Sequence, residues 1–573
     1  MSSDKPIIVQ SDKTVFLEVD SPLFEDARDM LGAFAELDKC PEHMHTYLIS
    51  PLSLWNAASA GLDSTHIIDG LRRYSRYPVP GNVEADIIEY MGRYGRLVLD
   101  RMGENLVLRS EDPLLLDQVA QHKKTKDYVS GRLDKHTLAV GGEYRGHLKQ
   151  DLIKLGFPVK DLAGYVAGEA LAIALRETTL QGKALQLRDY QHSAIASFYR
   201  DGRADGGSGV VVLPCGSGKT VIGLGAMSEV KRRTLILVTN IVALHQWKRE
   251  ILDKTTLTEQ EITEYSGERK DIGPVTIATY QILTYRKKNS DEFPHLKVFE
   301  AQDWGLILYD EVHLLPAPVF RITADIQARR RLGLTATLIR EDGLESDVFS
   351  LIGPKCYDVP WKVLEKQGWI ASAQCHEVRT PLPMEKRKEY VMSPPRTQFR
   401  IASENPLKID MIEQIMGQHQ EDRVLIIGQY LKQLSIVAAA FHLPLITGKT
   451  PNQERETLFR QFRTGEIKQL VVSKVANFAV DLPEANIAIQ ISGTFGSRQE
   501  EAQRLGRILR PKEEGKIAHF YSIVTKDSCE GEFAQKRQRF LTEQGYQYEI
   551  HPVDENLKLQ SMVLPALGDG STG

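Results

Sequence analysis

Apolar and polar residues follow two different patterns along the chain. In the first third, short alternating runs stand next to segments with apolar residues at helical spacing. Residues 6–19 predict a β-hairpin, and residues 22–37 predict a helix. Two more helices are predicted within residues 50–75, because Ser50-Pro51 and Asp63-Ser64-Thr65 are typical of helix starts.

The rest of this first third predicts small mixed folds. Residues 102–110 predict a strand, and residues 136–157 predict a strand, a turn and a helix. We therefore expect two N-terminal α+β domains, residues 1–110 and residues 111–182. The helices of the first are similar to a winged-helix arrangement.

From Leu185 onward, apolar strand-like runs alternate with helical segments, which is typical of a parallel sheet with crossover helices. Such runs form two sets, before and after residue 400: VVVLP, TLILVT, VTIAT, GLILYD and LGLTAT, then VLIIG, PLITG, QLVVS, AIQIS and IAHFYSIV. We expect two α/β domains, residues 183–375 and residues 407–550.

Residues 376–406 lie between the two expected α/β domains and differ from both. From Thr380 to Pro406 the chain has Pro-rich edges, five Lys or Arg residues, and two aromatic residues, Tyr390 and Phe399. This segment is interpreted as a basic insertion or a linker. The C-terminal tail, residues 551–573, ends in Gly, Ser and Asp and is expected to be disordered.

Composition narrows the class of protein. The 573 residues include 72 Lys and Arg against 76 Asp and Glu, so no overall basic field indicates a nucleic-acid partner, and any such partner needs local patches. The five Cys lie far apart, which disfavours a disulfide framework and a Cys-rich metal site. No stretch approaches the roughly 18 apolar residues of a membrane span, and the start does not match a signal peptide. We expect a cytoplasmic protein with no membrane partner.

The clearest chemical signal follows the first apolar strand run. It consists of Pro214, Cys215, Gly216, Ser217, Gly218, Lys219 and Thr220, and a helical segment comes next. Glycines let backbone N–H groups surround a phosphate, Lys219 can reach the β and γ phosphates, and Thr220 can offer its hydroxyl to Mg²⁺. The strict phosphate-loop pattern is missed at Leu213, so a Gly-rich turn in an unrelated α/β protein stays open on this segment alone.

A carboxylate pair, Asp310-Glu311, follows the apolar run WGLILY. Asp310 can hold Mg²⁺, Glu311 can polarise an attacking water, and His313 can report the nucleotide state to a neighbouring domain. Alone, such a pair is usually a solvated turn. Its position after the Lys219 motif favours a nucleotide-hydrolysing site.

Arginines recur every three residues in Gln503-Arg504-Leu505-Gly506-Arg507-Ile508-Leu509-Arg510. On one helical face they can stabilise charge on a γ phosphate bound by another domain, which would make hydrolysis depend on domain closure. A basic surface helix is the alternative for this segment taken by itself.

Together these segments resemble the motifs of superfamily 2 helicases, and most closely those of the XPB family. Gly-Ser-Gly-Lys-Thr resembles motif I, DEVH motif II, Thr335-Ala336-Thr337 motif III, and QRLGRILR motif VI. LRDYQ is similar to the adenine-reading motif, so the resemblance gives Gln191 a contact with the base and puts Arg188 nearby. It makes Arg507 the arginine finger with Arg510 second, and puts Gln503 and Arg504 near the nucleotide.

The resemblance also implies groups that couple ATP to DNA. Arg340, Glu341 and Asp342 are similar to the RED element of the family, residues 376–406 stand where it has a DNA-gripping thumb, and residues 111–182 occupy the place of its damage-recognition domain. Gln246 and Thr279 are implied to contact the DNA backbone, with His245 and Trp247 beside Gln246. In motif V, Asp481 fits, but Ala476-Asn477 replaces the usual Gly-Asp, which puts the strength of coupling in doubt.

The resemblance implies two RecA-like motor domains behind N-terminal α+β accessory domains, with ATP and Mg²⁺ as cofactors. The implied activity is DNA unwinding in the 3′-to-5′ direction in DNA repair. A translocase that tracks duplex DNA, and an ATP-switched clamp that recruits a nuclease or repair partner, remain alternatives. An RNA helicase is disfavoured by the match to the XPB accessory regions.

Overall fold

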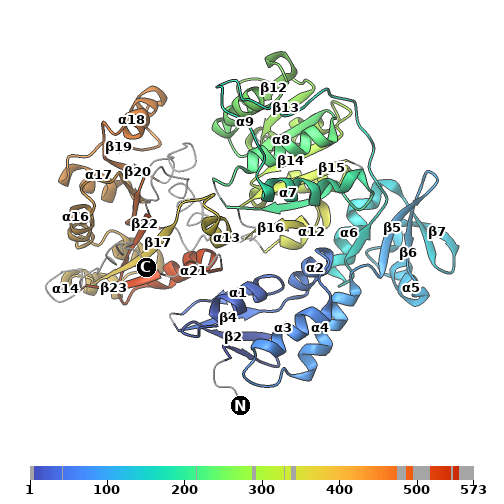
Figure 1. The fold of residues 1–573 in the computed structure, drawn as a ribbon, viewed down its shortest axis with the longest axis horizontal. Helices are drawn as coiled ribbons and strands as arrows, with labels where there is room; N and C mark the ends of the chain where they lie inside the picture. Colours follow the sequence, from blue (N-terminus) through green and yellow to red (C-terminus); the bar gives the residue numbers. More distant parts are fainter. Residues whose placement is uncertain are drawn as a thin grey trace, which may run out of the picture. The chain divides into compact units, whose positions relative to one another are not determined.

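The structure is a computed structural model in which the chain forms two units, Met1–Pro360 and Trp361–Gly573 (Figure 1). It describes residues 5–41, 43–214, 216–286, 292–327, 329–336, 343–359, 361–473, 485–493, 517–543, 546 and 548–553. No helix in this described part is long and apolar enough to span a bilayer.

The first unit begins with a four-stranded antiparallel sheet in the order β1-β2-β4-β3, accompanied by four helices. The elements are β1 (Ile7–Val9), β2 (Thr14–Glu18), α1 (Phe24–Gly32), β3 (Glu36–Lys39), β4 (Met44–Leu48), α2 (Pro51–Ser59), α3 (Ser64–Tyr74) and α4 (Gly81–Arg93). The predicted hairpin is confirmed, and so are both predicted helix starts, since Ser50 and Asp63 each cap a helix N-terminus. The helix predicted over residues 22–37 ends at Gly32, and its last residues belong to β3.

A second small sheet follows, in the order β7-β8-β6-β5-β9. Its elements are β5 (Leu97–Met102), β6 (Asn105–Arg109), α5 (Pro113–Gln121), β7 (Val129–Asp134), β8 (Thr137–Val140), α6 (Arg145–Lys154) and β9 (Val159–Asp161). Because β6 pairs with β8 and β5 pairs with β9, a division at residue 110 separates strands of one sheet. Buried Lys149 on α6 donates to Asp161 (3.0 Å) and to Gln327 (2.9 Å), so this sheet is tied to the α/β part of the same unit.

The first large sheet is entirely parallel, in the order β12-β13-β11-β14-β15-β10-β16. Its strands are β10 (Ser208–Val212), β11 (Thr234–Val238), β12 (Ile262–Tyr265), β13 (Val275–Thr279), β14 (Leu306–Asp310), β15 (Arg330–Thr335) and β16 (Lys355–Asp358). Its helices are α7 (Asp189–Tyr199), α8 (Lys219–Val230), α9 (Ile241–Lys254), α10 (Tyr280–Leu283), α11 (Ala317–Asp325) and α12 (Glu345–Leu351). Central strands such as β11 and β13 are buried along their whole length, which explains their continuous apolar runs.

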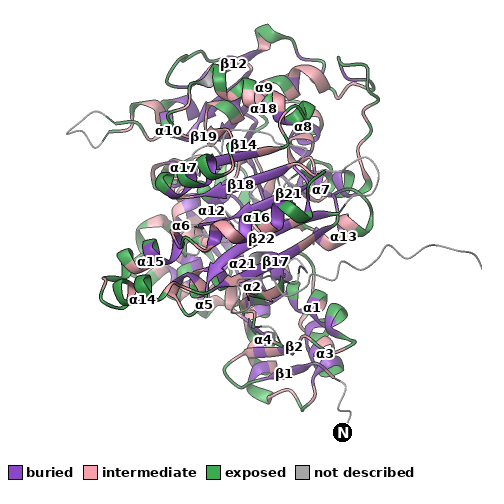
Figure 2. Cartoon of the chain, turned by 90° about the vertical axis from the view of Figure 1, so that its left-hand side faces the viewer, coloured by how far each residue is buried: buried purple, intermediate pink, exposed green. Residues whose placement is uncertain are grey.

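The second unit repeats this topology. Its parallel sheet has the order β19-β20-β18-β21-β22-β17-β23, so the strands occupy the same places in chain order as in the first large sheet. The strands are β17 (Ala373–Thr380), β18 (Val424–Gly428), β19 (Leu445–Ile446), β20 (Gln469–Ser473), β21 (Ile487–Gln490), β22 (Ala518–Thr525) and β23 (Tyr548–Pro552). The helices are α13 (Trp361–Lys366), α14 (Met384–Val391), α15 (Pro395–Ser403), α16 (Lys408–Gln418), α17 (Leu431–Ala440), α18 (Asn452–Thr464) and α21 (Cys529–Glu543). Figure 2 shows the buried residues concentrated along strands such as β18 and β22. The expected α/β class with two parallel-sheet domains is confirmed.

The segment predicted as an insertion, residues 376–406, begins inside a strand of the second sheet. Residues 376–380 complete β17, an interior strand of the second sheet, and the rest includes the helices α14 and α15. Phe399, one of its two aromatic residues, is buried against Phe533 with ring centroids 5.1 Å apart, so it is not exposed for stacking on a base. Tyr390 accepts a hydrogen bond from the backbone N–H of Cys529 (2.8 Å), so it supports the start of α21.

Candidate active site

The two glycines described in the loop between β10 and α8 have a backbone conformation that suits phosphate binding. Gly216 and Gly218 have φ angles of 81° and 83°, a region that residues with a Cβ avoid. The Ser217 hydroxyl donates to the carbonyl oxygen of Pro214 (2.7 Å) and fixes the turn. Lys219 begins α8, and its ammonium group lies 3.3 Å from that same carbonyl oxygen. The loop therefore presents a helix N-terminus and a cation on the same turn.

Helix α7 packs directly on this loop through Gln191. The Gln191 side chain accepts from the backbone N–H of Arg188 (3.0 Å) and donates to the carbonyl oxygen of Ser217 (3.2 Å). Tyr190 donates to the same carbonyl oxygen, and Arg188 donates to the Tyr190 hydroxyl (3.0 Å). A Cβ on Gly218 would lie 2.7 Å from the Gln191 amide nitrogen, so a larger residue here would displace that amide. The residues predicted to contact adenine thus also connect α7 to the phosphate loop.

Asp310 ends β14, one strand away from β15 and two from β10. Its carboxylate accepts a hydrogen bond from the indole N–H of Trp247 on α9 (2.9 Å), and its backbone carbonyl accepts one from the Tyr280 hydroxyl (2.9 Å). Burial, and then the charge of Glu311, raise the pKa of Asp310 to about 6, while the Trp247 hydrogen bond opposes this increase. A buried carboxylate beside another carboxylate favours a nearby cation.

Glu311 has a left-handed backbone conformation, with φ of 50°. This costs a non-glycine residue free energy and is common at functional sites. Within the described residues its buried Oε2 atom has no hydrogen-bond partner, and His313 Nδ1 lies 3.5 Å from it. His313 Nδ1 also lies 2.7 Å from the Thr335 hydroxyl, and the Thr335 carbonyl accepts from the backbone N–H of Leu213 (3.0 Å). Glu311 is therefore connected through His313 and Thr335 to the phosphate loop.

These residues fit a nucleoside triphosphate with Mg²⁺. The glycine turns and Lys219 would hold phosphates, and Asp310 with the first-turn Thr220 would hold the metal. The unsatisfied Oε2 of Glu311 is suited to accept a proton from water. When bound, the metal supplies charge neutralisation at the phosphates.

Several predicted site residues lie outside the described residues: Cys215, Thr337, Arg340, Glu341, Asp342, Asp481, Gln503, Arg504, Arg507 and Arg510. The arginine finger and the RED-like element therefore stay predictions.

The two predicted DNA contacts have different environments. Thr279 is buried, and its hydroxyl accepts from the backbone N–H of Ile282 (3.4 Å) at the start of α10. Gln246 is half-buried on α9. The structure thus shows a capping role for Thr279 and leaves Gln246 nearer to solvent.

The sequence prediction placed Trp247 with the DNA contacts and did not single out Tyr280, yet both hold Asp310. Trp247 is 2% exposed, on the apolar face of α9 with Leu244 and Ile251. A Cβ on Gly223 of α8 would lie 2.6 Å from the indole ring, so this glycine makes room for it. The apolar spacing in α9 indicates that Trp247 is buried, but it does not indicate which carboxylate the N–H reaches.

A parallel sheet with a phosphate loop after one strand and a carboxylate pair after another defines a nucleotide-hydrolysing enzyme of the phosphate-loop class. Comparison with known families specifies it further. Residues 364–564 match the family described as ERCC3/RAD25/XPB C-terminal helicase, residues 184–340 match the res subunit of type III restriction enzymes, and residues 7–134 match a helicase conserved C-terminal domain.

Full-length relatives give the same answer. The chain is 55% identical to the DNA 3′-5′ helicase XPB of Mycobacterium tuberculosis, over 97% of this chain and 99% of the relative. It is 54% identical to the protein of that name in Kineococcus radiotolerans, over 96% and 97% of the two chains. It is 32% identical to the general transcription and DNA repair factor IIH helicase/translocase subunit XPB/SSL2 of Saccharomyces cerevisiae, over 95% and 71%. The chain belongs to the XPB family of DNA helicases, and it is an ATP-dependent enzyme of that class.

Proposed function

We propose that this protein hydrolyses ATP with Mg²⁺ to move 3′-to-5′ along DNA and separate its strands during DNA repair. The observation that carries the proposal is the chain of contacts from Glu311 through His313 and Thr335 to the phosphate loop, in which the Glu311–His313 distance is 3.5 Å. Such a path links the group suited to activate water with the loop suited to hold phosphate. The direction and the repair setting rest on the names of the relatives.

Each described residue has a distinct role in this proposal. Lys219 stabilises charge on the β and γ phosphates, Thr220 and Asp310 hold Mg²⁺, and Glu311 orients the attacking water. His313 and Thr335 transmit the state of the nucleotide site to the carboxyl end of β15. Arg507 and Arg510 supply positive charge from the second α/β domain, as the motif resemblance implies.

The partner and location follow from the relatives rather than from a contact in the structure. DNA is bound without sequence preference through backbone contacts. The two bacterial relatives favour a cytoplasmic protein, and a nuclease or repair protein is the proposed partner.

The first experiment is steady-state ATPase activity with no polymer, with single-stranded DNA, with duplex DNA and with RNA. Lys219→Ala serves as the blank, and Lys231→Ala at the end of the same helix serves as the matched control. We expect DNA to stimulate hydrolysis in the wild-type and control proteins alone. Equal activity with every polymer would contradict the motor.

Strand displacement then separates the alternatives. A duplex translocase hydrolyses ATP on duplex DNA without releasing a strand. In a clamp, Glu311→Gln keeps function because ATP binding is enough, whereas in a helicase it stops displacement. Glu300→Gln, at an exposed position, controls for the loss of a carboxylate.

A further inference from the structure

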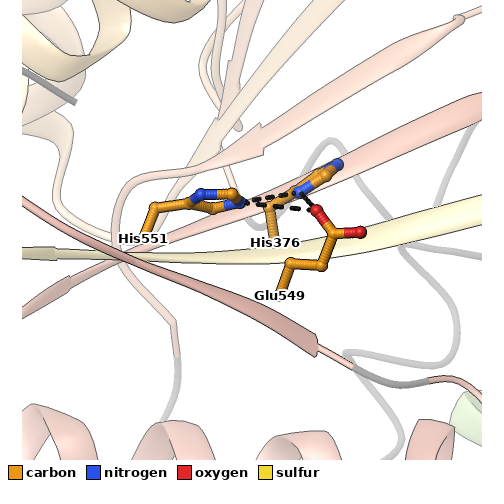
Figure 3. A group of neighbouring side chains, drawn as sticks. All are labelled: His376, Glu549 and His551. Carbon is orange, nitrogen blue, oxygen red and sulfur yellow. Dashed lines mark hydrogen bonds and ion pairs between the residues drawn. The ribbon is translucent and has the colours of Figure 1, made fainter. Parts of the chain in front are cut away.

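A second cluster of chemically active side chains lies in the other unit, on one face of the second large sheet. It consists of His376 on β17 with Glu549 and His551 on β23 (Figure 3). His376 pairs with Glu549 in the register of the two parallel strands, so their side chains are on the same face. His551 is two residues after Glu549 and shares that face. Among the described residues this is the only such group of three with metal-ligand atoms close together.

The distances between ligand atoms match a tetrahedral metal site. His376 Nδ1 lies 3.0 Å from His551 Nε2 and 3.4 Å from Glu549 Oε2, and the last two atoms are 3.8 Å apart. Zinc binds imidazole nitrogen and carboxylate oxygen at about 2.0–2.2 Å, which at tetrahedral angles separates ligand atoms by about 3.3–3.6 Å. The three observed distances bracket this range, so shifts of a few tenths of an ångström suffice.

The surroundings of His376 are those of a metal ligand. Its other nitrogen, Nε2, lies 3.1 Å from His519 Nδ1, and its ring stacks on Tyr521 at 4.5 Å. A metal-bound histidine usually donates its second N–H to a hydrogen-bond acceptor, which fixes the tautomer and ring orientation, and His519 Nδ1 can serve as that acceptor here.

We propose that His376, His551 and Glu549 bind one Zn²⁺ ion, with a water molecule in the fourth position, and that the ion ties β23 to β17. Two imidazoles and one carboxylate favour zinc over Mg²⁺, which prefers oxygen ligands and octahedral geometry. The Glu549 side chain is 61% exposed, which leaves a path for the ion and room for water. This site is separate from the ATP site, and the inference does not depend on the proposed function.

The proton balance is simple. In the metal-free protein, the 3.0 Å contact between His376 Nδ1 and His551 Nε2 is a hydrogen bond that one ring donates. Zinc replaces that proton, which moves to the other nitrogen of a neutral imidazole, and both facing nitrogens then offer lone pairs. His376 Nε2–H donates to His519.

The test uses the reduced full-length protein after removal of metals with a chelator. Zn²⁺ is titrated in competition with a chromophoric chelator, and Co²⁺ is added separately because tetrahedral cobalt absorbs strongly in the visible range. We expect one equivalent to bind, a tetrahedral cobalt spectrum, and a rise in the unfolding temperature with zinc.

Two variants remove ligands, and one controls for them. His551→Gln is expected to weaken zinc binding by more than about 100-fold, because loss of an outer partner alone costs about 10–100-fold. Glu549→Gln, at an exposed position, is expected to weaken it by at least about tenfold with the fold preserved. His442→Asn changes an exposed histidine in the same unit, at a positive φ that Asn tolerates, and is expected to bind like wild type.

The outer partner provides an independent test. His519→Phe keeps an aromatic ring but removes the acceptor for His376, and is expected to weaken zinc binding by about 10–100-fold. Wild-type binding no tighter than that of His551→Gln and Glu549→Gln, or an octahedral cobalt spectrum, would overturn the proposal. ATPase activity is measured in parallel, and its loss or retention tests only the proposed function.

Discussion

Trp247→Phe isolates one hydrogen bond in the ATP site. The substitution keeps an aromatic ring on the buried face of α9 and removes the N–H that donates to Asp310 over 2.9 Å. Asp310 is the group proposed to hold Mg²⁺, and Trp247 itself touches neither metal nor nucleotide in the proposal. The variant therefore tests positioning of the carboxylate.

The expected decrease in kcat follows from the charge and burial of the Asp310 carboxylate, which accepts the hydrogen bond. A hydrogen bond to a charged group contributes about 1.5–3 kcal/mol. If the transition state needs Asp310 in this orientation, the loss corresponds to a decrease in kcat of about 10- to 150-fold. Because Gly223 leaves space for the indole, the smaller ring also leaves a void and lowers stability.

Trp304→Phe is the matched control. Trp304 is fully buried in the same unit, and its N–H donates to the backbone carbonyl of Val298 over 2.9 Å, away from the carboxylates. DNA-stimulated kcat, the Mg²⁺ dependence and the unfolding temperature are measured for both variants. We expect similar losses of stability, with a large loss of kcat in Trp247→Phe alone. Equal kcat in the two variants would refute the positioning role.

Three further predictions concern stability. Lys408→Met removes the cation that lies 2.8 Å from the buried Glu530 carboxylate, and should lower the free energy of unfolding by about 3–5 kcal/mol. Adding Glu530→Gln should restore most of this loss, and urea unfolding of the single and double variants measures both effects. Burial lowers the pKa of His45 to about 4, so the unfolded state binds more protons than the folded state between pH 6.5 and pH 4. The free energy of unfolding near β4 should therefore fall toward pH 4 by up to about 1.4 kcal/mol per pH unit. Hydrogen exchange measures this slope, and His45→Phe should remove it. Gly146→Ala would place a Cβ 2.3 Å from the Ala324 carbonyl oxygen and should cost about 1–3 kcal/mol in thermal unfolding.

Each of these has an outcome that contradicts it. An additive double variant at Lys408 and Glu530 would show that the pair is not coupled. A pH slope that persists in His45→Phe would assign the acid sensitivity to other groups. Wild-type stability in Gly146→Ala would mean that α6 does not pack tightly on α11.

The strands that consist of apolar residues could be predicted from the sequence, whereas strands that contain both polar and apolar residues were missed. β11 and β13 are apolar throughout because both faces are covered, so their runs stand out. β17 carries buried His376 and Glu377 inside an interior strand, and β23 reads Tyr-Glu-Ile-His-Pro, so neither shows an apolar run. His376 contacts His519 and His551 on the neighbouring strands, whereas Glu377 accepts hydrogen bonds from Arg379 of its own strand and Gln538 of α21. A single sequence does not display these contacts.

The residues of the candidate active site also include some that the sequence indicates and some that it does not. Lys219, Asp310 and Glu311 could be singled out because each belongs to a recognisable motif that follows an apolar strand. Trp247 and Tyr280 reach Asp310 because their helices follow β11 and β13, which lie one strand and two strands away from β14 in the sheet. Strand order decides that contact, and strand order depends on packing over the whole sheet.

The shared strand order also constrains how the chain folds. In both large sheets the first strand pairs with the last two, so Ser208 meets Arg331 and Ala373 meets Ala518 only after well over a hundred intervening residues are synthesised. Until then, β10 and β17 have two open edges, and pairing must overcome a large loop-closure entropy. The phosphate loop therefore gains its supporting neighbours late in synthesis, and an incomplete chain exposes unpaired apolar strands that favour aggregation.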